Sequence, residues 1–402
     1  MKTSLSSSGK EVLIYYIELA NHLGGSDYLP LLLIAELQKR GYHVTLVLDF
    51  KADLERASKL YNVFFDIQKV RMISITPMQP LIRKLDAYIP FCRVRRMKKL
   101  VKQADICISA SNMFDFGKPA HHVVFLINFF GDNAFHNFIM HRKPLTGLPL
   151  FKQKFRTFFA ETFLRPILGV RSTRRIIADP REHIYVPSQY VANTMQAFYG
   201  QFNCTLFYPP TIFEIPQMNV KRHPERVIYL GRIHPDKRIQ DIIEIVERTR
   251  ELSGLPLELY FAGNLKNNAY AEGIQKQTAD KSWVQFVGPV YEKEKAAFLL
   301  SGTYAIHAER DEAFGISITE YLKAGCIPIV PDEGGTPEIV GNPALTYHTN
   351  EDAARILIRL LTDEAFHLEQ LSYCKERAKE YSFERYMETQ HKILDKILGE
   401  PF

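Results

Sequence analysis

The sequence is short of cysteine and of long apolar runs, and both shortages exclude classes of protein. Five cysteines are scattered without a CxxC or CxxxC pair, which argues against a zinc site, a disulfide scaffold and secretion. No apolar run approaches the roughly 20 residues that span a bilayer. The first ten residues, MKTSLSSSGK, contain no apolar signal core. We therefore expect a cytosolic protein.

Several ligand-binding signatures are also missing. No GxGxxG follows a predicted strand, so a dinucleotide-binding fingerprint is not supported. No helix-turn-helix, RRM, KH or zinc-finger pattern occurs, and we expect no nucleic-acid partner.

The size and composition indicate a globular protein of two domains. The chain has 402 residues, of which 46% are hydrophobic and 24% charged. Residues 1–215 carry 28 Lys and Arg against 16 Asp and Glu, a net +12; from the chain totals of 51 and 45, residues 216–402 retain 23 against 29, a net −6. A basic first half and an acidic second half suggest units with different partners.

The first half alternates strands and helices. Strand patterns at 12–19, 44–48, 70–75, 106–110, 122–127 and 183–188 are separated by helical stretches. Gly24 and Gly25 lie where the first strand leads into its helix, and glycines there let the backbone approach a ligand closely, although an ordinary tight turn explains them equally well.

Two basic stretches in this half have amphipathic character. FCRVRRMKKLVKQ at 91–103 interleaves cations with apolar residues, and FKQKFRTFFAETFLRPILGVRSTRR at 151–175 is rich in Phe and basic residues. Such stretches suit an anionic membrane surface. Solvated helix faces over a core stripe are the alternative.

Prolines mark the domain boundary. Pro209, Pro210 and Pro216 stiffen the chain and end regular structure, which places the boundary near residue 215. The expected domains are 1–215 and 216–402.

The second half repeats the alternation, with strands at 226–230, 257–262, 284–287, 304–307 and 327–330 and three short helices from about 351 to 398. A βαβα order without hairpin signals predicts a parallel sheet in each domain, hence two Rossmann-like α/β domains with ligand-binding ends facing across a cleft. The loops after the first four strands should share one edge of the second sheet.

Charged residues gather in two of these loops. Arg232 and Lys237 suit a diphosphate, while Glu312 precedes a helix expected to start near Gly315 and Glu320 lies two turns into it. A phosphate site beside carboxylates that address hydroxyls indicates a nucleotide-sugar ligand. The simpler alternative is that Glu312 only stabilises the helix start and Glu320 is solvated.

The triplet Glu309-Arg310-Asp311 formally fits the acidic motif of metal-dependent glycosyltransferases. One short triplet is too few hard oxygen ligands for a metal, and Arg232 and Lys237 already supply the counter-charge. We expect no metal site.

Residues 226–341 resemble the donor domain of family 4 glycosyltransferases, which have the GT-B architecture. The matching pieces are GRIHPDK, FAGN, VQFVGPV, EAFGISITE with its E-x7-E spacing, and GGTPEIV. The first half is similar more loosely, through Gly24-Gly25 and RGYHVTLV, and YPP at 208–210 resembles the interdomain stretch.

The resemblance implies a retaining transfer of a hexosyl group, mannosyl or glucosyl, from a UDP- or GDP-sugar to a hydroxyl of a glycan or lipid-linked acceptor. Residues 1–215 would bind the acceptor and residues 216–402 the donor. The reaction would need no metal or other cofactor. It implies that Arg232 and Lys237 bind the diphosphate, that Glu312 faces the donor sugar and that Glu320 takes the ribose hydroxyls. Such enzymes build glycans, lipopolysaccharide or surface polysaccharide, here at the inner face of a membrane.

The remaining donor contacts follow by position in the same motifs. Phe314, Gly315 and Ile316 would offer backbone amides to phosphate or sugar, and Gly24 and Gly25 would close over the phosphates. The other positions in the expected donor site are Gly263, Asn264, Val287 and Gly288, of which the last two would line the base.

Two positions depart from the family pattern. Asn128 stands where many members have a His near the transferred sugar, and Arg238 stands where a Gly often follows the Lys. An Asn hydrogen-bonds a hydroxyl but cannot act as a base. A non-catalytic binding subunit therefore stays open as an alternative, as does a sugar phosphorylase or epimerase of the same fold.

Overall fold

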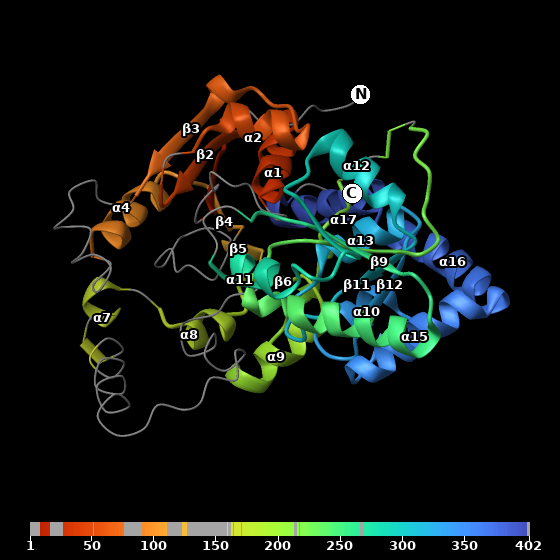
Figure 1. The fold of residues 1–402 in the computed structure, drawn as a ribbon. Coiled ribbons are helices and arrows are strands. Elements are labelled where there is room, and N and C mark those ends of the chain that lie inside the picture. Colours follow the sequence, from red (N-terminus) through yellow and green to blue (C-terminus); the bar gives the residue numbers. More distant parts are fainter. Residues whose placement is uncertain are drawn as a thin grey trace. The chain divides into compact units, whose positions relative to one another are not determined.

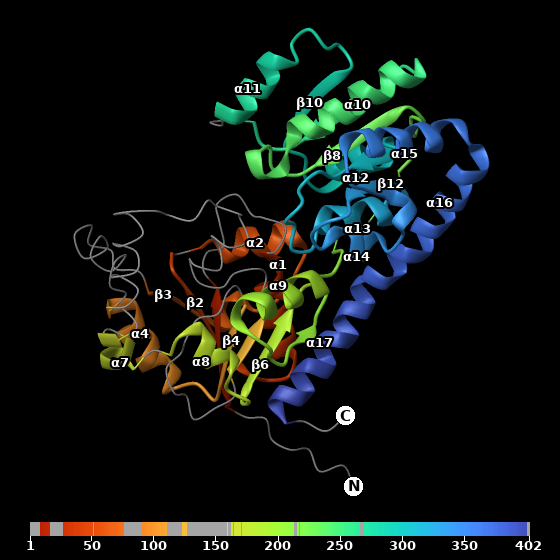
Figure 2. The same cartoon turned by 90° about the horizontal axis from the view of Figure 1, so that it is seen from below.

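The computed structural model describes two compact units. It describes residues 9–16, 27–50, 52–75, 91–110, 123–126, 159, 162–163, 165–169, 171–212, 215–216, 218–265 and 269–399. One unit comprises the described residues up to Phe207 together with 390–399, and the other comprises those from Tyr208 to Thr389. Figures 1 and 2 show the elements of both units in two views.

The first unit is built on a seven-stranded sheet. All its strands are parallel, in the order β3-β2-β1-β4-β5-β6-β7. The elements along the chain are β1 (Glu11–Tyr16), α1 (Tyr28–Lys39), β2 (His43–Leu48), α2 (Leu54–Tyr61), η1 (Ile67–Lys69), β3 (Val70–Ser74), α4 (Phe91–Val101), β4 (Ile106–Ser109), β5 (Val123–Leu126), α7 (Arg165–Leu168), α8 (Thr173–Ile177), β6 (Glu182–Val186), α9 (Gln189–Tyr199) and β7 (Thr205–Leu206).

The second unit has a six-stranded parallel sheet in the order β10-β9-β8-β11-β12-β13. Its elements are β8 (Arg226–Leu230), η3 (Pro235–Lys237), α10 (Ile239–Ser253), β9 (Glu258–Ala262), α11 (Ala269–Gln277), β10 (Val284–Gly288), α12 (Glu292–Ser301), β11 (Tyr304–Ile306), α13 (Ile316–Lys323), β12 (Ile327–Pro331), α14 (Thr336–Val340), η4 (Pro343–Leu345), β13 (Thr346–Tyr347), α15 (Asn350–Thr362), α16 (Glu364–Ala378), η5 (Lys379–Tyr381) and α17 (Phe383–Leu398).

Apolar runs explain why these segments become central strands. Every residue of β11 and β12 is buried, as parallel strands covered on both faces require. In α10, buried positions recur at helical spacing, and this face packs with α15, which runs beside it in Figure 1. The sequence prediction of two parallel α/β sheets is confirmed.

Most of the expected strand positions agree with the structure within one or two residues. The main additions are β7, β13 and α14, which lie in segments that the sequence patterns left as turns or loops. The three helices after Thr349 end at Leu398 as expected, but they span 13, 15 and 16 residues. No helix in the described part of the chain combines the length and the apolar character needed to cross a bilayer.

The division into units differs from the boundary predicted near residue 215. It falls between Phe207 and Tyr208, and the end of α17 groups with the first unit. Two ion pairs attach that end: Arg40 Nη1 lies 2.5 Å from Asp395 Oδ1, and His391 Nε2 lies 3.1 Å from Glu36 Oε2. Proline composition alone could not reveal this return, because it depends on partners more than 350 positions apart.

Candidate donor site

The loops after β8, β9 and β10 meet at one edge of the second sheet. The Gly231 amide donates to the Ala262 carbonyl at 3.0 Å, and the Gly263 amide donates to the Gly288 carbonyl at 2.9 Å. Parallel pairing directs the carboxyl ends of all these strands to the same edge, which is where such sheets bind ligands. The predicted common edge is confirmed.

Lys237 is brought to this edge by a short turn. His234 and Pro235 start the single turn of η3, and Arg238 then adopts a left-handed conformation, with φ of 50°, before α10 begins. The Arg238 guanidinium is paired with Asp241 at 2.6 Å on the same helix. Arg238 thus forms an ion pair at the start of its own helix, whereas the Lys237 side chain points toward the loop after β11.

Two carboxylates of the β11 loop hold the Lys237 ammonium. Its Nζ lies 2.5 Å from Glu312 Oε2 and also contacts Glu309 Oε2. Burial opposes the charged form of Lys237, but the charges of Glu312 and Glu309 raise its pKa above the usual value. The lysine therefore stays protonated here.

The same contacts shift the pKa values of the two acids in opposite directions. Burial and the Glu312 charge raise the pKa of Glu309. Burial alone would also raise the pKa of Glu312, but the charge of Lys237 holds it below the usual range. Glu312 is thus the permanent anion of the pair.

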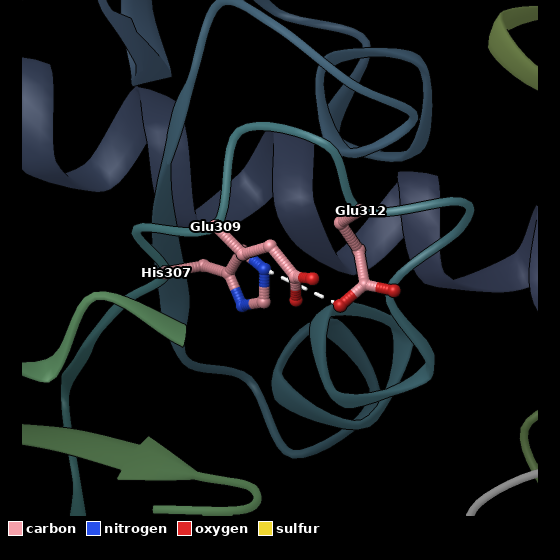
Figure 3. A group of neighbouring side chains, drawn as sticks. All are labelled: His307, Glu309 and Glu312. Atoms are coloured by element: carbon pink, nitrogen blue, oxygen red, sulfur yellow. Dashed lines mark ion pairs between the residues drawn. The ribbon is translucent and has the colours of Figure 1, made fainter. Parts of the chain in front are cut away.

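His307 completes this group at the end of β11. Its imidazole is 2% exposed, and Nε2 lies 3.6 Å from Glu312 Oε2. Neither ring nitrogen has a hydrogen-bond partner among the described residues. Figure 3 shows the ring and both carboxylates turned toward one another. Burial lowers the pKa of His307 to about 4, so the ring is neutral at physiological pH.

Glu309 is the site residue that sequence reasoning missed. The prediction treated Glu309-Arg310-Asp311 as a loop feature, yet Glu309 points inward to Lys237 while Arg310 turns away to Glu333, at 2.7 Å. The signal available in the sequence was three acidic residues among four positions directly after a buried strand. Propensity cannot say which of them points inward.

Ligand atoms of His307, Glu309 and Glu312 lie within 4.8 Å of one another, which is close enough to surround a cation. The cation between the two carboxylates is the Lys237 ammonium. A second group, Asp332, Glu333 and His348, is exposed, and its acids pair with Arg310.

The EAFG segment is fixed by aromatic packing. The buried Phe314 ring stacks on Tyr208, with centroids 5.9 Å apart, and the Tyr208 hydroxyl donates to Glu338 at 2.7 Å. Gly315 has φ of +94°, a conformation that favours glycine. Its carbonyl accepts from the Ile318 amide in the first turn of α13, which begins at Ile316. The YPP stretch thus anchors the site loop.

Glu320 lies inside α13 with 6% exposure, and its carboxylate pairs with Lys295 of α12. The alternative of a solvated Glu320 is therefore wrong. The alternative role for Glu312 also fails, because α13 has no acidic residue in its first turn and Glu312 instead pairs with Lys237.

The remaining predicted positions are not part of the group formed by Lys237, Glu309 and Glu312. Arg232 is exposed, and its carbonyl accepts from the Tyr229 hydroxyl at 3.0 Å. Asn264 follows Gly263 at the same edge, and Val287 is 45% exposed beside Gly288, whose φ is +82°. Gly24, Gly25 and Asn128 lie outside the described residues.

Comparison with known families gives this geometry a context. Residues 212–381, which contain the whole site edge, match the family model of glycosyl transferases group 1. These residues thus form a domain of the group 1 glycosyltransferase family. The predicted resemblance to family 4 is confirmed.

One curated relative of this chain is the GDP-Man:Man(3)GlcNAc(2)-PP-Dol alpha-1,2-mannosyltransferase of Candida albicans. The two are 28% identical over 148 residues, which are 32% of this chain and 24% of the relative. The match thus spans about a quarter of the relative's length.

Solved structures establish the GT-B fold of the chain. Sucrose-phosphate synthase from Thermosynechococcus elongatus is 14% identical, with a TM-score of 0.66 over 98% of this chain and 100% of that one. WaaG, a glycosyltransferase involved in lipopolysaccharide biosynthesis, is also 14% identical, with a TM-score of 0.64 over 97% and 100%. Anabaena Alr3699/HepE, in complex with UDP and glucose, is 12% identical, with a TM-score of 0.63 over 96% and 100%.

Proposed function

We propose that this glycosyltransferase moves a hexosyl group from a nucleotide sugar to an acceptor hydroxyl with retention of configuration. The observation that carries the proposal is the Lys237 ammonium, fixed by two carboxylates at the ligand-binding edge of a parallel sheet. A fixed cation at that edge suits the charge that develops on a departing nucleoside diphosphate.

In this proposal the positive side chains replace a metal. Lys237 and the exposed Arg232 neutralise the diphosphate, since a compact ammonium and a planar guanidinium both bind phosphate oxygens. Glu312 faces the donor sugar. Glu320 takes the ribose hydroxyls, and its pairing with Lys295 orients the carboxylate.

The transfer itself is a displacement on one face of the sugar. The bond from the anomeric carbon to the diphosphate oxygen breaks, the acceptor oxygen bonds to the same carbon, and the acceptor proton passes to the leaving phosphate oxygen. No separate side-chain base is needed, which makes Asn128 compatible with transfer.

The donor base is tested by thermal stabilisation. We expect one of UDP, GDP and ADP, with its sugars, to raise the melting temperature of the protein equally with and without magnesium. Ligand at a hundred times its Kd stabilises by about 2.7 kcal/mol, which is a readily measured shift. The Candida relative is named for GDP-mannose and the Anabaena structure holds UDP, so the panel includes both. A shift that requires magnesium, or no shift at all, would contradict the proposal.

The acceptor side is proposed to work at an anionic membrane surface on a glycan or lipid-linked acceptor. In α4, Met97 and Val101 are buried while Arg95 and Lys99 are exposed, as is Lys102 directly after the helix. The helix contacts α7, which lies next to it in Figure 2. The sequence analysis left a solvated face as the alternative, and the exposed cations fit both readings.

Exposed apolar side chains beside α4 favour the membrane. Phe159, Phe163 and Ile167 are 44%, 48% and 77% exposed, and the two Phe rings lie 5.5 Å apart. Basic residues next to exposed aromatic and aliphatic groups are typical of binding to anionic lipid.

The membrane proposal predicts a charge-dependent association. Reversing Lys99 and Lys102 to Glu should weaken co-sedimentation with phosphatidylglycerol vesicles by about 2 kcal/mol or more, roughly thirty-fold, because each basic residue near the surface contributes about 1 kcal/mol. The matched control reverses Lys59 and Lys69, which are exposed on α2 and η1. Equal losses in both variants would show a general charge effect and contradict a docking face.

A further inference from the structure

The site holds one more acidic side chain than its lysine can neutralise. The Lys237 ammonium contacts carboxylate oxygens of both Glu309 and Glu312, and all three side chains are less than a fifth exposed. Among the described residues, Lys237 is the one cation that pairs with Glu309. Two buried carboxylates around one ammonium leave a surplus anion when both are ionised.

The groups around Glu309 cannot supply that missing charge. Lys237 faces it from η3, Glu312 from its own loop and Tyr229 from β8, where burial and neighbouring charges keep the phenol neutral. His307 at the end of β11 is buried and its pKa is lowered, so it too is neutral. The balance therefore depends on the protonation of the acids.

Under the proposed function, a nucleoside diphosphate adds further negative charge at this ammonium. As Lys237 turns to the phosphate oxygens, its compensation of the two acids weakens, and an ionised Glu309 would repel the ligand at short range in a poorly solvated site. Glu312 is the acid that keeps its charge, because the Lys237 ammonium lowers its pKa. Glu309, whose pKa is raised, is the acid that can be neutralised.

We propose that Glu309 is a positioning residue that holds Lys237 in the empty site and that the donor binds with Glu309 in its neutral carboxylic acid form. Where Glu309 is ionised beforehand, binding takes up one proton from solvent onto the carboxylate, and release of the nucleotide returns it. Glu309 thereby sets the affinity for the donor. This inference rests on the proposed nucleotide-sugar function.

The sign of the pH dependence follows directly. Bound phosphate raises the pKa of Glu309 above its value in the empty site, so the full affinity is present below the empty-site pKa. Affinity is lost as pH rises through that value, by up to about tenfold per pH unit. The burial and charge that already raise the pKa of Glu309 place this loss on the neutral-to-alkaline side.

The experiment is calorimetric titration of the full chain with GDP and UDP from about pH 7 to about pH 9.5, a range above the second phosphate pKa of about 6. Each pH is measured in two buffers of different ionisation enthalpy, which counts the protons taken up. The variant is Glu309→Gln, whose amide oxygen still accepts from Lys237. The control is Glu333→Gln, which removes a charge from the exposed partner of Arg310.

Wild-type protein and Glu333→Gln should bind the nucleotide more weakly at alkaline pH and take up as much as one proton there. Glu309→Gln should bind equally across the range, without proton uptake, and more tightly than wild type at the alkaline end. A Glu309→Gln protein that keeps the pH dependence, or a folded one that no longer binds nucleotide, would overturn the inference alone. Failure of wild type to bind either nucleotide at any pH would overturn the proposed function together with it.

Discussion

Replacing Lys237 with alanine is expected to abolish sugar transfer while the fold persists. The ammonium is the buried positive charge of the site, fixed by Glu309 and Glu312, and the proposed reaction places negative charge on the phosphate oxygens beside it. Loss of one fixed group that stabilises such charge costs about 10²–10³ in turnover number. The measurement is steady-state transfer with the donor identified by the nucleotide panel.

Stability must be separated from catalysis in this test. Lys237→Ala leaves two buried acids without their cation, and breaking a buried pair in this way costs about 3–5 kcal/mol unless one acid takes up a proton. The double variant Lys237→Ala with Glu309→Gln removes the surplus acid and should regain much of the melting temperature without regaining transfer. Near-wild-type transfer by Lys237→Ala would remove this lysine from the mechanism.

Replacing Gly263 with alanine is expected to destabilise the second unit and to damage the nucleotide site. A Cβ at this position would lie 2.2 Å from the Gly231 carbonyl oxygen and 3.1 Å from the Ile233 side chain. The clash is with backbone, which cannot rotate away, so the β8 and β9 loops must separate. We expect a loss of about 1–3 kcal/mol or more, seen as a lower melting temperature, together with weaker nucleotide binding as the Arg232 loop shifts.

Gly273→Ala is the matched control for that substitution. Gly273 lies inside α11, and no atom of the described residues lies within 4 Å of an added Cβ. The same chemical change should therefore stabilise by about 0.5–1 kcal/mol, since alanine has the better helix propensity. If both variants melted like wild type, the close approach of the Gly231 and Gly263 loops would not hold in solution.

The sequence by itself determined the architecture and the edge on which the site lies. Fully apolar runs such as Ile327–Val330 predict buried parallel strands, because a strand covered on both faces needs no polar side. Parallel strands end at a common edge, so loops carrying Lys237 and Glu312 had to meet there. Gly315, whose φ is positive, marked the start of α13 correctly. These are local patterns, and local physics decides them.

Only the tertiary structure decided which side chains pair. The inward turn of Glu309, the burial of Glu320 against Lys295 and the return of Asp395 to Arg40 each join residues far apart in the sequence. An acidic residue in a loop has the same propensity whether it faces solvent or a buried lysine. Its partner depends on how distant strands bring their loops together, and the balance of desolvation and charge at that meeting point then sets its protonation.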